Sequence, residues 1–280
     1  MNKETFLSKL TEESEHYNKI LETDKGDWIV KGFIDSYKKI YTISIDTKVV
    51  SKVIEILLTP MFEEFANKNN LTLETQEKQN HYPDLTFISN ESREKFAVDI
   101  KTTIRKTKDK INSMTLGTYQ GYFQNRSEKD CISYPYDDYS AHIVFGVLYS
   151  RREENPNEKQ IFSLDELENI PSVIKAFQFF VQEKYKVASA TKGSGNTRNI
   201  GSVTNVDDLI RGNGVFSEFG EEVFDDYWMH YIDQSRADEL GQSRPYKNIK
   251  TYFTYKDSIK EIEEEKKQKA IIKEQSESDE

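Results

Sequence analysis

The sequence has few of the residues that build disulfides, thiolate metal sites or membrane spans. Cys131 is the only cysteine in 280 residues, which excludes an intrachain disulfide and a cysteine zinc site. The four histidines lack metal-binding spacing, and no apolar run approaches the roughly 18 residues of a membrane span. The first residues, Met1–Thr5, carry no apolar core of a secretory signal. We therefore expect a cytoplasmic protein.

The charge is negative in total but unevenly distributed. The net charge is −10, which argues against binding to nucleic acid because affinity for DNA comes mainly from Lys and Arg contacts to phosphate. Residues 101–110, however, hold five cations and one anion, whereas residues 256–280 hold nine acids and six bases. The charge thus weakens an interaction with DNA without excluding it. We expect one domain over residues 1–255, followed by a helical or disordered charged tail with no catalytic part.

A β-hairpin is the most informative local pattern. Two runs of β-branched and aromatic residues, Leu85–Ile88 and Phe96–Ile100, flank a polar turn. Asp84 precedes the first run and Asp99 lies near the end of the second, so antiparallel pairing makes the two carboxylates neighbours. Lys101 follows Asp99 by two residues and points to the same face of the strand.

Two carboxylates and one ammonium on one face suit Mg²⁺-dependent cleavage of a phosphodiester. Mg²⁺ is often held by one or two carboxylates together with water and substrate phosphate. A bound metal polarises the phosphate, and a nearby lysine stabilises the developing charge. This short pattern also arises by chance, and an ordinary surface hairpin with exposed charges is favoured when the pattern is considered alone.

Further blocks of sequence point to a known family. They occur in the order Asp46–Val49, Gln79–Asp84, Ala97–Thr103, Gly193–Thr197 and Asn199–Ser202. With the Pro-Asp…Asp-X-Lys hairpin, they resemble the EcoRV family of type II restriction endonucleases, of the PD-(D/E)XK superfamily, from about residue 45 to 231.

The resemblance implies a fold and an activity. The fold would be α/β, a mixed central β-sheet flanked by helices, with a catalytic hairpin at residues 81–103 and a recognition loop at residues 191–202. The enzyme would be a homodimer that uses Mg²⁺ to hydrolyse both strands of duplex DNA at a short palindromic site. GATATC with a blunt cut and 5′-phosphate ends is implied, as is a cognate DNA methyltransferase that acts on the same site.

The resemblance also implies roles for individual residues of the hairpin. Asp84 and Asp99 would hold the metal in a surface-facing site, with the carbonyl of Ile100 as a further ligand. Lys101 would orient or activate the attacking water. Glu55 matches a helical acid that leans toward this site and shares in catalysis and metal binding. The alternative for Glu55 is half of a solvated Lys–Glu pair.

The glycine-containing loop is expected to read the DNA. Gly193 and Gly195 allow close approach, Asn196 offers the bidentate pair that adenine presents, and the methyl group of Thr197 can meet a thymine methyl. A flexible surface loop is the alternative. Arg198 replaces a Thr of the family, and either contacts phosphate or changes the outer base preference. All residues expected to contact DNA are Lys48, Gln79, Asn80, Thr102, Thr103, Gly193, Ser194, Gly195, Asn196, Thr197, Arg198 and Asn199.

Two other functions remain open at this point. A structure-selective repair nuclease of the same superfamily would share the hairpin but would have no reason to keep residues 193–197. A non-catalytic DNA-binding relative would tolerate loss of the catalytic residues, and all three are present.

Expected secondary structure elsewhere follows from periodicity and breakers. We expect a helix over residues 3–22 and another from Asp46 or Thr47 to about Asn69, with a kink or break at Pro60. A buried strand is expected over Ala141–Tyr149 and a further strand over Tyr185–Ala188.

Overall fold

The structure is organised around a mixed five-stranded β-sheet. The computed structural model describes residues 1–76, 81–126, 131–152, 160–193 and 198–278. The strand order is β3-β4-β5-β7-β9, in which β5 and β7 run parallel and the other neighbours antiparallel. These strands are β3 (Leu71–Thr75), β4 (Leu85–Ser89), β5 (Lys95–Ile104), β7 (Tyr139–Arg151) and β9 (Ile174–Glu183). The predicted α/β class with a mixed central sheet is confirmed.

Both faces of the central sheet are covered, so its middle strands carry apolar residues on each side. Phe96 and Val98 of β5 belong to one hydrophobic cluster, whereas Ala97 between them belongs to the other. Helices α1 (Lys3–Ser14), α2 (Asn18–Leu21) and α3 (Thr47–Lys68) contribute to the first cluster. There Phe6 stacks on Phe96 with ring centroids 4.3 Å apart. Burying one such ring contributes about 1.5–3 kcal/mol.

The second face is covered by a small sheet and short helices. The strands, in the order β10-β11-β6, are β6 (Thr115–Thr118), β10 (Ala188–Lys192) and β11 (Asn199–Ser202). The helices are α4 (Lys184–Val187), α5 (Val206–Arg211) and α6 (Glu221–Met229), with a 3₁₀ turn at η1 (Tyr136–Asp138). This face carries Ala97 and, by alternation along β5, also Asp99 and Lys101.

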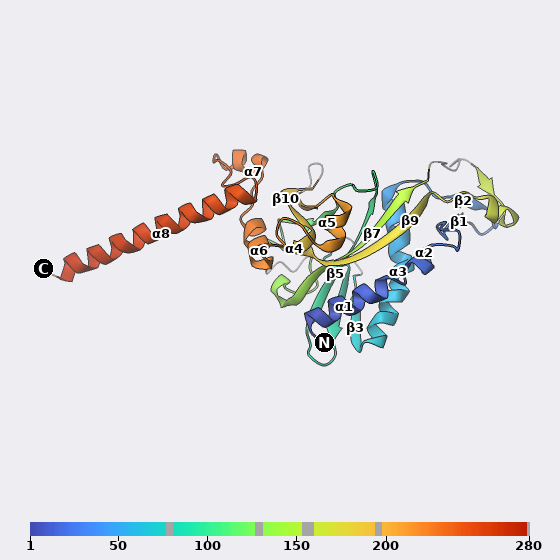
Figure 1. Cartoon of the computed structure of the whole chain (residues 1–280), viewed down its shortest axis with the longest axis horizontal. Helices are drawn as coiled ribbons and strands as arrows, with labels where there is room; N and C mark the ends of the chain where they lie inside the picture. The colour runs from blue at the N-terminus through green and yellow to red at the C-terminus, as the bar shows by residue number, and fades with distance from the viewer. Residues whose placement is uncertain (77–80, 127–130, 153–159, 194–197, 279–280) are drawn as a thin grey trace.

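A second small sheet lies at the end of the molecule opposite to the C-terminal helix (Figure 1). Its strands are β1 (Gly32–Ile34), β2 (Ile40–Thr42) and β8 (Ile161–Phe162), followed by the 3₁₀ helix η2 (Leu164–Asn169). Ser163 and Glu166 form a capping box at the start of η2.

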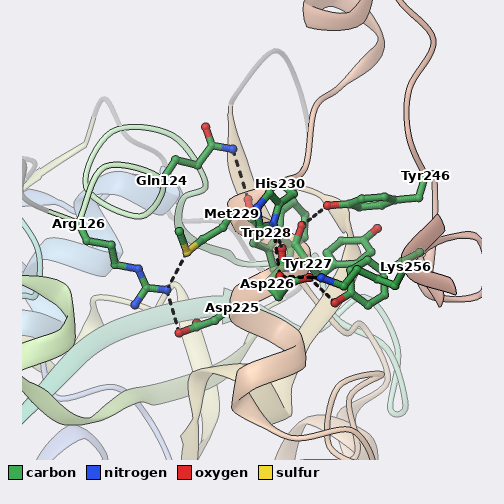
Figure 2. A network of polar contacts seen from close by, with 11 residues as sticks. Gln124, Arg126, Asp225, Asp226, Tyr227, Trp228, Met229, His230, Tyr246 and Lys256 are labelled. Carbon is green, nitrogen blue, oxygen red and sulfur yellow. Dashed lines mark hydrogen bonds and ion pairs between the residues drawn. The ribbon is translucent and has the colours of Figure 1, made fainter. Parts of the chain in front are cut away.

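The C-terminal part is anchored on α6. After α7 (Gln234–Glu239), helix α8 (Ile249–Ser278) begins with polar contacts to α6. Lys256 Nζ lies 3.1 Å from Asp226 Oδ2, and the Tyr246 hydroxyl donates to the Tyr227 carbonyl at 2.6 Å (Figure 2). The rest of α8 extends away from the body (Figure 1). The tail is therefore helical and its helix begins seven residues before the expected boundary at 256, while the division into domains stays a prediction. No helix in the described ranges is long and apolar enough to cross a membrane.

Three expectations about secondary structure differ from the structure. The N-terminal helix is interrupted between Ser14 and Asn18, where a turn buries Tyr17 against Phe62 at a centroid distance of 6.1 Å. A break at Pro60 is wrong, because α3 continues through it and its apolar side stays packed on the core. The strand expected over 185–188 is mostly the helix α4, which turns the chain from β9 into β10. The buried strand over 141–149 is confirmed within β7.

Candidate active site

The hairpin brings the two predicted carboxylates and the lysine together. Leu85 of β4 pairs with Val98 of β5, so Asp84 and Asp99 are the next residues across the ladder. Lys101 Nζ lies 2.7 Å from Asp99 Oδ2 and 3.8 Å from Asp84 Oδ2. The three side chains that the hairpin spacing predicted to be neighbours therefore lie together, with both carboxylates within ion-pair distance of the lysine.

The backbone of β5 also takes part in this arrangement. The Ile100 N–H donates to Asp84 Oδ2 at 2.7 Å, so the Asp84 side chain reaches across to the neighbouring strand. This contact fixes the carboxyl group beside Asp99. The role of the Ile100 carbonyl as a ligand stays a prediction.

The site is more enclosed than the sequence suggested. Asp99 is only 5% exposed, whereas Asp84 and Lys101 are partly exposed. The expectation that Asp99 faces the surface is therefore wrong. The reason is that the second hydrophobic cluster packs over the β5 face that carries Asp99. Replacing Asp99 will consequently affect stability as well as chemistry, and Asp99→Asn is a better probe than Asp99→Ala because it retains the side-chain volume.

Electrostatics separate the two carboxyl groups. Burial, together with the charge of Asp99, raises the pKa of Asp84 to about 7. Burial alone would also raise the pKa of Asp99, but the ammonium groups of Lys101 and Lys184 outweigh it and hold that pKa below its usual value. Burial would lower the pKa of Lys101, but the two carboxylates raise it. The three groups thus behave as one strongly interacting cluster.

The cluster fits a small divalent cation bound by oxygen ligands. Burial and the charge of Asp99 raise the pKa of Asp84, and a cation between the two carboxyl groups would favour the ionised form of both. Among the described residues, no group of three or more His, Cys, Asp or Glu side chains could hold a metal. A closed structural site is therefore absent from that part of the chain. Two carboxylates that leave positions for water and phosphate are typical of Mg²⁺ sites.

Glu55 makes no ion pair with this cluster in the described structure, but its charge is close enough to Lys101 to help raise the pKa of that lysine. It belongs to α3, whose buried residues pack on the opposite face of the sheet, and its Oε1 pairs with Lys52 Nζ at 2.6 Å. The solvated Lys–Glu pair is thus present. A contribution of Glu55 to metal binding or catalysis stays a prediction.

Of the described residues near the hairpin that are expected to contact DNA, one is exposed and two have hydroxyl groups that form hydrogen bonds within the protein. Lys48 is exposed in the first turn of α3. The hydroxyl groups of Thr102 and Ser51 share a hydrogen bond between β5 and α3. Thr103 is buried and donates to the Asn112 carbonyl at 2.9 Å, which accounts for its hydroxyl without DNA.

The predicted recognition loop is described only at its two ends. The Gly193 N–H donates to the Asn199 carbonyl at 2.8 Å, which closes the base of the loop. The Arg198 guanidinium donates to Gln120 Oε1 at 2.6 Å, beside a cavity of about 420 Å³ that Arg236 also lines. Residues 79 and 80 and residues 194–197, which include Asn196, lie outside the described residues.

Sequence reasoning missed one charged residue near the site. Lys184 at the start of α4 is 2% exposed, and its charge contributes to the lowered pKa of Asp99. The segment Lys184–Val187 alternates polar and apolar residues like a half-exposed strand, so no local signal marked Lys184 as buried.

Comparisons with known proteins show what this chain is similar to. The model of the family described as restriction endonuclease EcoRV matches residues 24–257. The type II restriction enzyme EcoRV of Escherichia coli is 35% identical over 223 residues, which cover 78% of this chain and 89% of that protein. Among solved structures, the NlaIV restriction endonuclease is 9% identical, with a TM-score of 0.38 and coverage of 87% of this chain and 91% of that chain.

Proposed function

Because this chain belongs to the EcoRV family of restriction endonucleases, and is therefore a type II site-specific deoxyribonuclease that acts on DNA, we propose Mg²⁺-dependent cleavage of both strands at a short palindromic site. The observation that carries the proposal is the cluster of Asp84, Asp99 and Lys101, in which the ammonium lies 2.7 and 3.8 Å from the two carboxylates. GATATC, cut bluntly at its centre, is the proposed site.

The family uses a divalent metal, and we assign its ligands to the hairpin. Asp84 and Asp99 would hold Mg²⁺, with the carbonyl of Ile100 as a third protein ligand. When bound, such an ion polarises the phosphate and makes water a better nucleophile. Glu55 is proposed to lean toward the same site when DNA is bound.

The chain's own groups then position the reactants. Lys101 Nζ, held by Asp99 at 2.7 Å, can donate to the attacking water and to a phosphate oxygen as negative charge develops there. The water loses one proton to solvent as its oxygen bonds to phosphorus, the bond from phosphorus to the 3′ oxygen breaks, and that oxygen takes up a proton from solvent. The products are a 5′-phosphate and a 3′-hydroxyl. The burial of Asp99 excludes water from one side of the ion pair and strengthens it.

Recognition is assigned to the loop that β10 and β11 support. Gly193, Ser194, Gly195, Asn196, Thr197, Arg198 and Asn199 form its proposed DNA-reading segment, with further contacts from Gln79, Asn80, Lys48, Thr102 and Thr103. The loop base is attached to the same face of the sheet as the catalytic cluster. A base-reading segment and a scissile phosphate can thus belong to one DNA duplex. A cognate methyltransferase that modifies the same site is proposed as well.

We propose a homodimer whose interface lies on the small sheet β1-β2-β8. Large apolar side chains are exposed there and on η2, among them Ile29, Phe33, Ile34, Tyr37, Tyr41, Ile161, Leu164 and Leu167. A second copy of the chain would cover this apolar surface, and a two-fold dimer matches a palindromic site. We expect Ile34→Glu to shift the protein to monomers in sedimentation velocity. Ile262→Glu, at an exposed position on α8, is the matched control.

The direct test is digestion of a plasmid with one GATATC site, with Mg²⁺, followed by sequencing of the ends. We expect one blunt double-strand cut, and no cut in a plasmid that differs by one base within the site. Folded Asp99→Asn protein should bind this DNA but leave it intact. Cleavage by Asp99→Asn at the wild-type rate, or robust cleavage in chelator, would contradict the assignment.

A further inference from the structure

A lysine is buried beside the catalytic cluster without a hydrogen-bond partner. Lys184 is 2% exposed, and its Nζ makes no hydrogen bond to any described residue. Aromatic rings surround it instead, with centroids 4.5 Å from Nζ for Tyr82, 5.9 Å for Tyr122 and Tyr136, and 6.0 Å for Phe123. Ring faces attract an ammonium group, yet burying one without a counter-ion in contact remains unfavourable. Because burying this ammonium group is unfavourable, we expect a role that depends on its charge.

These four rings form the aromatic cage of Lys184, which lies next to the proposed metal-binding carboxylates in the fold. Tyr82, the ring nearest to the ammonium, precedes Asp84 by two residues. The cage rings belong to the hydrophobic cluster on the β5 face that carries Asp99. Burial lowers the pKa of Lys184 to about 8, and the attraction of Asp99 works against this lowering. The ammonium is therefore within electrostatic reach of the site but does not touch it.

Lys184 offsets one negative charge of the site. When Asp84 and Asp99 are both ionised they supply two negative charges, against the positive charges of Lys101 and Lys184, and Glu55 adds a further negative charge that acts on Lys101 from α3. A fixed positive charge repels a divalent cation twice as strongly as it repels a proton at the same place. The charge of Lys184 consequently opposes the binding of a divalent cation to the ionised carboxylates.

We propose that Lys184 is a charge-balancing residue whose buried ammonium keeps the affinity of the DNA-free carboxylate pair for divalent cations low. Tight binding of the metal then requires the negative phosphate of the DNA in the site. This inference rests on the proposed function, because it takes the carboxylate pair to be the metal site.

The test measures the binding of Mg²⁺ alone to the full chain, without DNA, by titration calorimetry at pH 7. Lys184→Met removes the charge and keeps an unbranched side chain that packs well on aromatic rings. We expect its dissociation constant for Mg²⁺ to be lower than that of the wild type by about fivefold or more. We also expect unchanged or increased thermal stability, because an unpaired buried charge is removed. A merely structural lysine would give the opposite result, a loss of stability with no gain in affinity.

Two further variants make the result specific. Lys186→Met removes a half-exposed lysine on the same short helix, paired with Glu183 Oε2 at 2.6 Å, and should leave Mg²⁺ affinity unchanged. Adding Asp99→Asn to Lys184→Met should abolish the gain, since the gain acts through that carboxylate.

The possible outcomes separate this inference from the proposed function. A folded Lys184→Met protein with unchanged or weaker Mg²⁺ binding overturns the inference, even if the wild type cuts DNA. If Lys184→Met and Lys184→Leu both fail to fold, the charge serves the fold and the inference is equally overturned. A wild-type protein that neither binds Mg²⁺ in the presence of GATATC duplex nor cuts it refutes the proposed function instead.

Discussion

Gly117 offers a sharp test of the packing beside the active site. Its φ of +90° lies in the region that favours glycine, and a Cβ built on it would lie 2.4 Å from the Tyr122 hydroxyl oxygen. Tyr122 is 4% exposed and stacks on Tyr82 at a centroid distance of 4.8 Å, so its ring has little room to withdraw. Gly117→Ala therefore combines two costs, one from the backbone and one from the overlap.

The two costs can be given magnitudes. A non-glycine residue at a left-handed φ costs about 1–2 kcal/mol, and overpacking of a filled interior costs about 1–3 kcal/mol. We expect Gly117→Ala to lower the free energy of unfolding by about 2–5 kcal/mol in total. Tyr122→Phe removes only the hydroxyl, which makes no hydrogen bond to the described residues, so this single change should be nearly neutral.

The double variant separates the two costs. With Phe at 122, the nearest ring atom lies 3.7 Å from the new Cβ, which is ordinary van der Waals contact. The variant with both changes should recover the stability that the overlap removes and should lose only the stability that the backbone strain removes. The expected coupling energy between the two positions is therefore about 1–3 kcal/mol. Urea unfolding of the four proteins at one fixed protein concentration measures it. Additivity of the two single changes within about 0.5 kcal/mol would refute the overlap.

Three other predictions concern charge, chemistry and DNA recognition. Burial and the charge of Asp225 raise the pKa of Glu221 to about 7, so the folded protein holds a proton that the unfolded chain releases, and stability falls as pH rises from about 4.5 to 7. In urea unfolding, Glu221→Gln should therefore add about 1–3 kcal/mol to the free energy of unfolding at pH 8 and little at pH 4. The matched control Glu222→Gln, at the exposed neighbouring position, should change the free energy of unfolding by less than about 0.5 kcal/mol. Lys101→Met should lose cleavage by at least about a hundredfold while retaining DNA affinity in Ca²⁺, measured by single-turnover digestion and filter binding; weaker binding as its only defect would make Lys101 a phosphate contact. Arg198→Thr should weaken binding to all sequences alike and lower the salt slope by about one per subunit, and a changed base preference in a randomised six-base library would show instead that Arg198 reads a base.

Local patterns predicted the catalytic hairpin because its geometry is local. Side-chain alternation and antiparallel pairing relate Asp84, Asp99 and Lys101 within a segment of 18 residues, without help from the rest of the fold. The near-continuous apolar run over 141–149 likewise predicted a buried strand, and β7 lies between β5 and β9. In both cases the residues that determine the structure are close together in the sequence, so the local pattern was sufficient to predict it.

Tertiary packing decided what local patterns left open. Pro60 removes one hydrogen bond from α3, but the buried face of that helix on either side holds it continuous. The chain turns at 184–187 because β9 has to pass into β10 on another sheet, and no residue type in that segment announces the turn. The burial of Lys184 follows from this turn and from four rings that are distant in sequence. The position of Lys184 beside the carboxylates therefore could not be predicted from local sequence patterns.

Part of the net charge of −10 lies away from the catalytic face. Residues 256–280 carry nine acids and six bases, a net charge of −3, and most of them belong to the part of α8 that leaves the body (Figure 1). A helix of 30 residues is roughly 45 Å long, several times the Debye length of about 8 Å at physiological salt. Charge near its free end is screened from the catalytic face. At that face the local balance is different, because the positive charges of Lys101 and Lys184 act on the carboxyl group of Asp99. The net charge of the chain is thus a poor guide to the field that DNA encounters there.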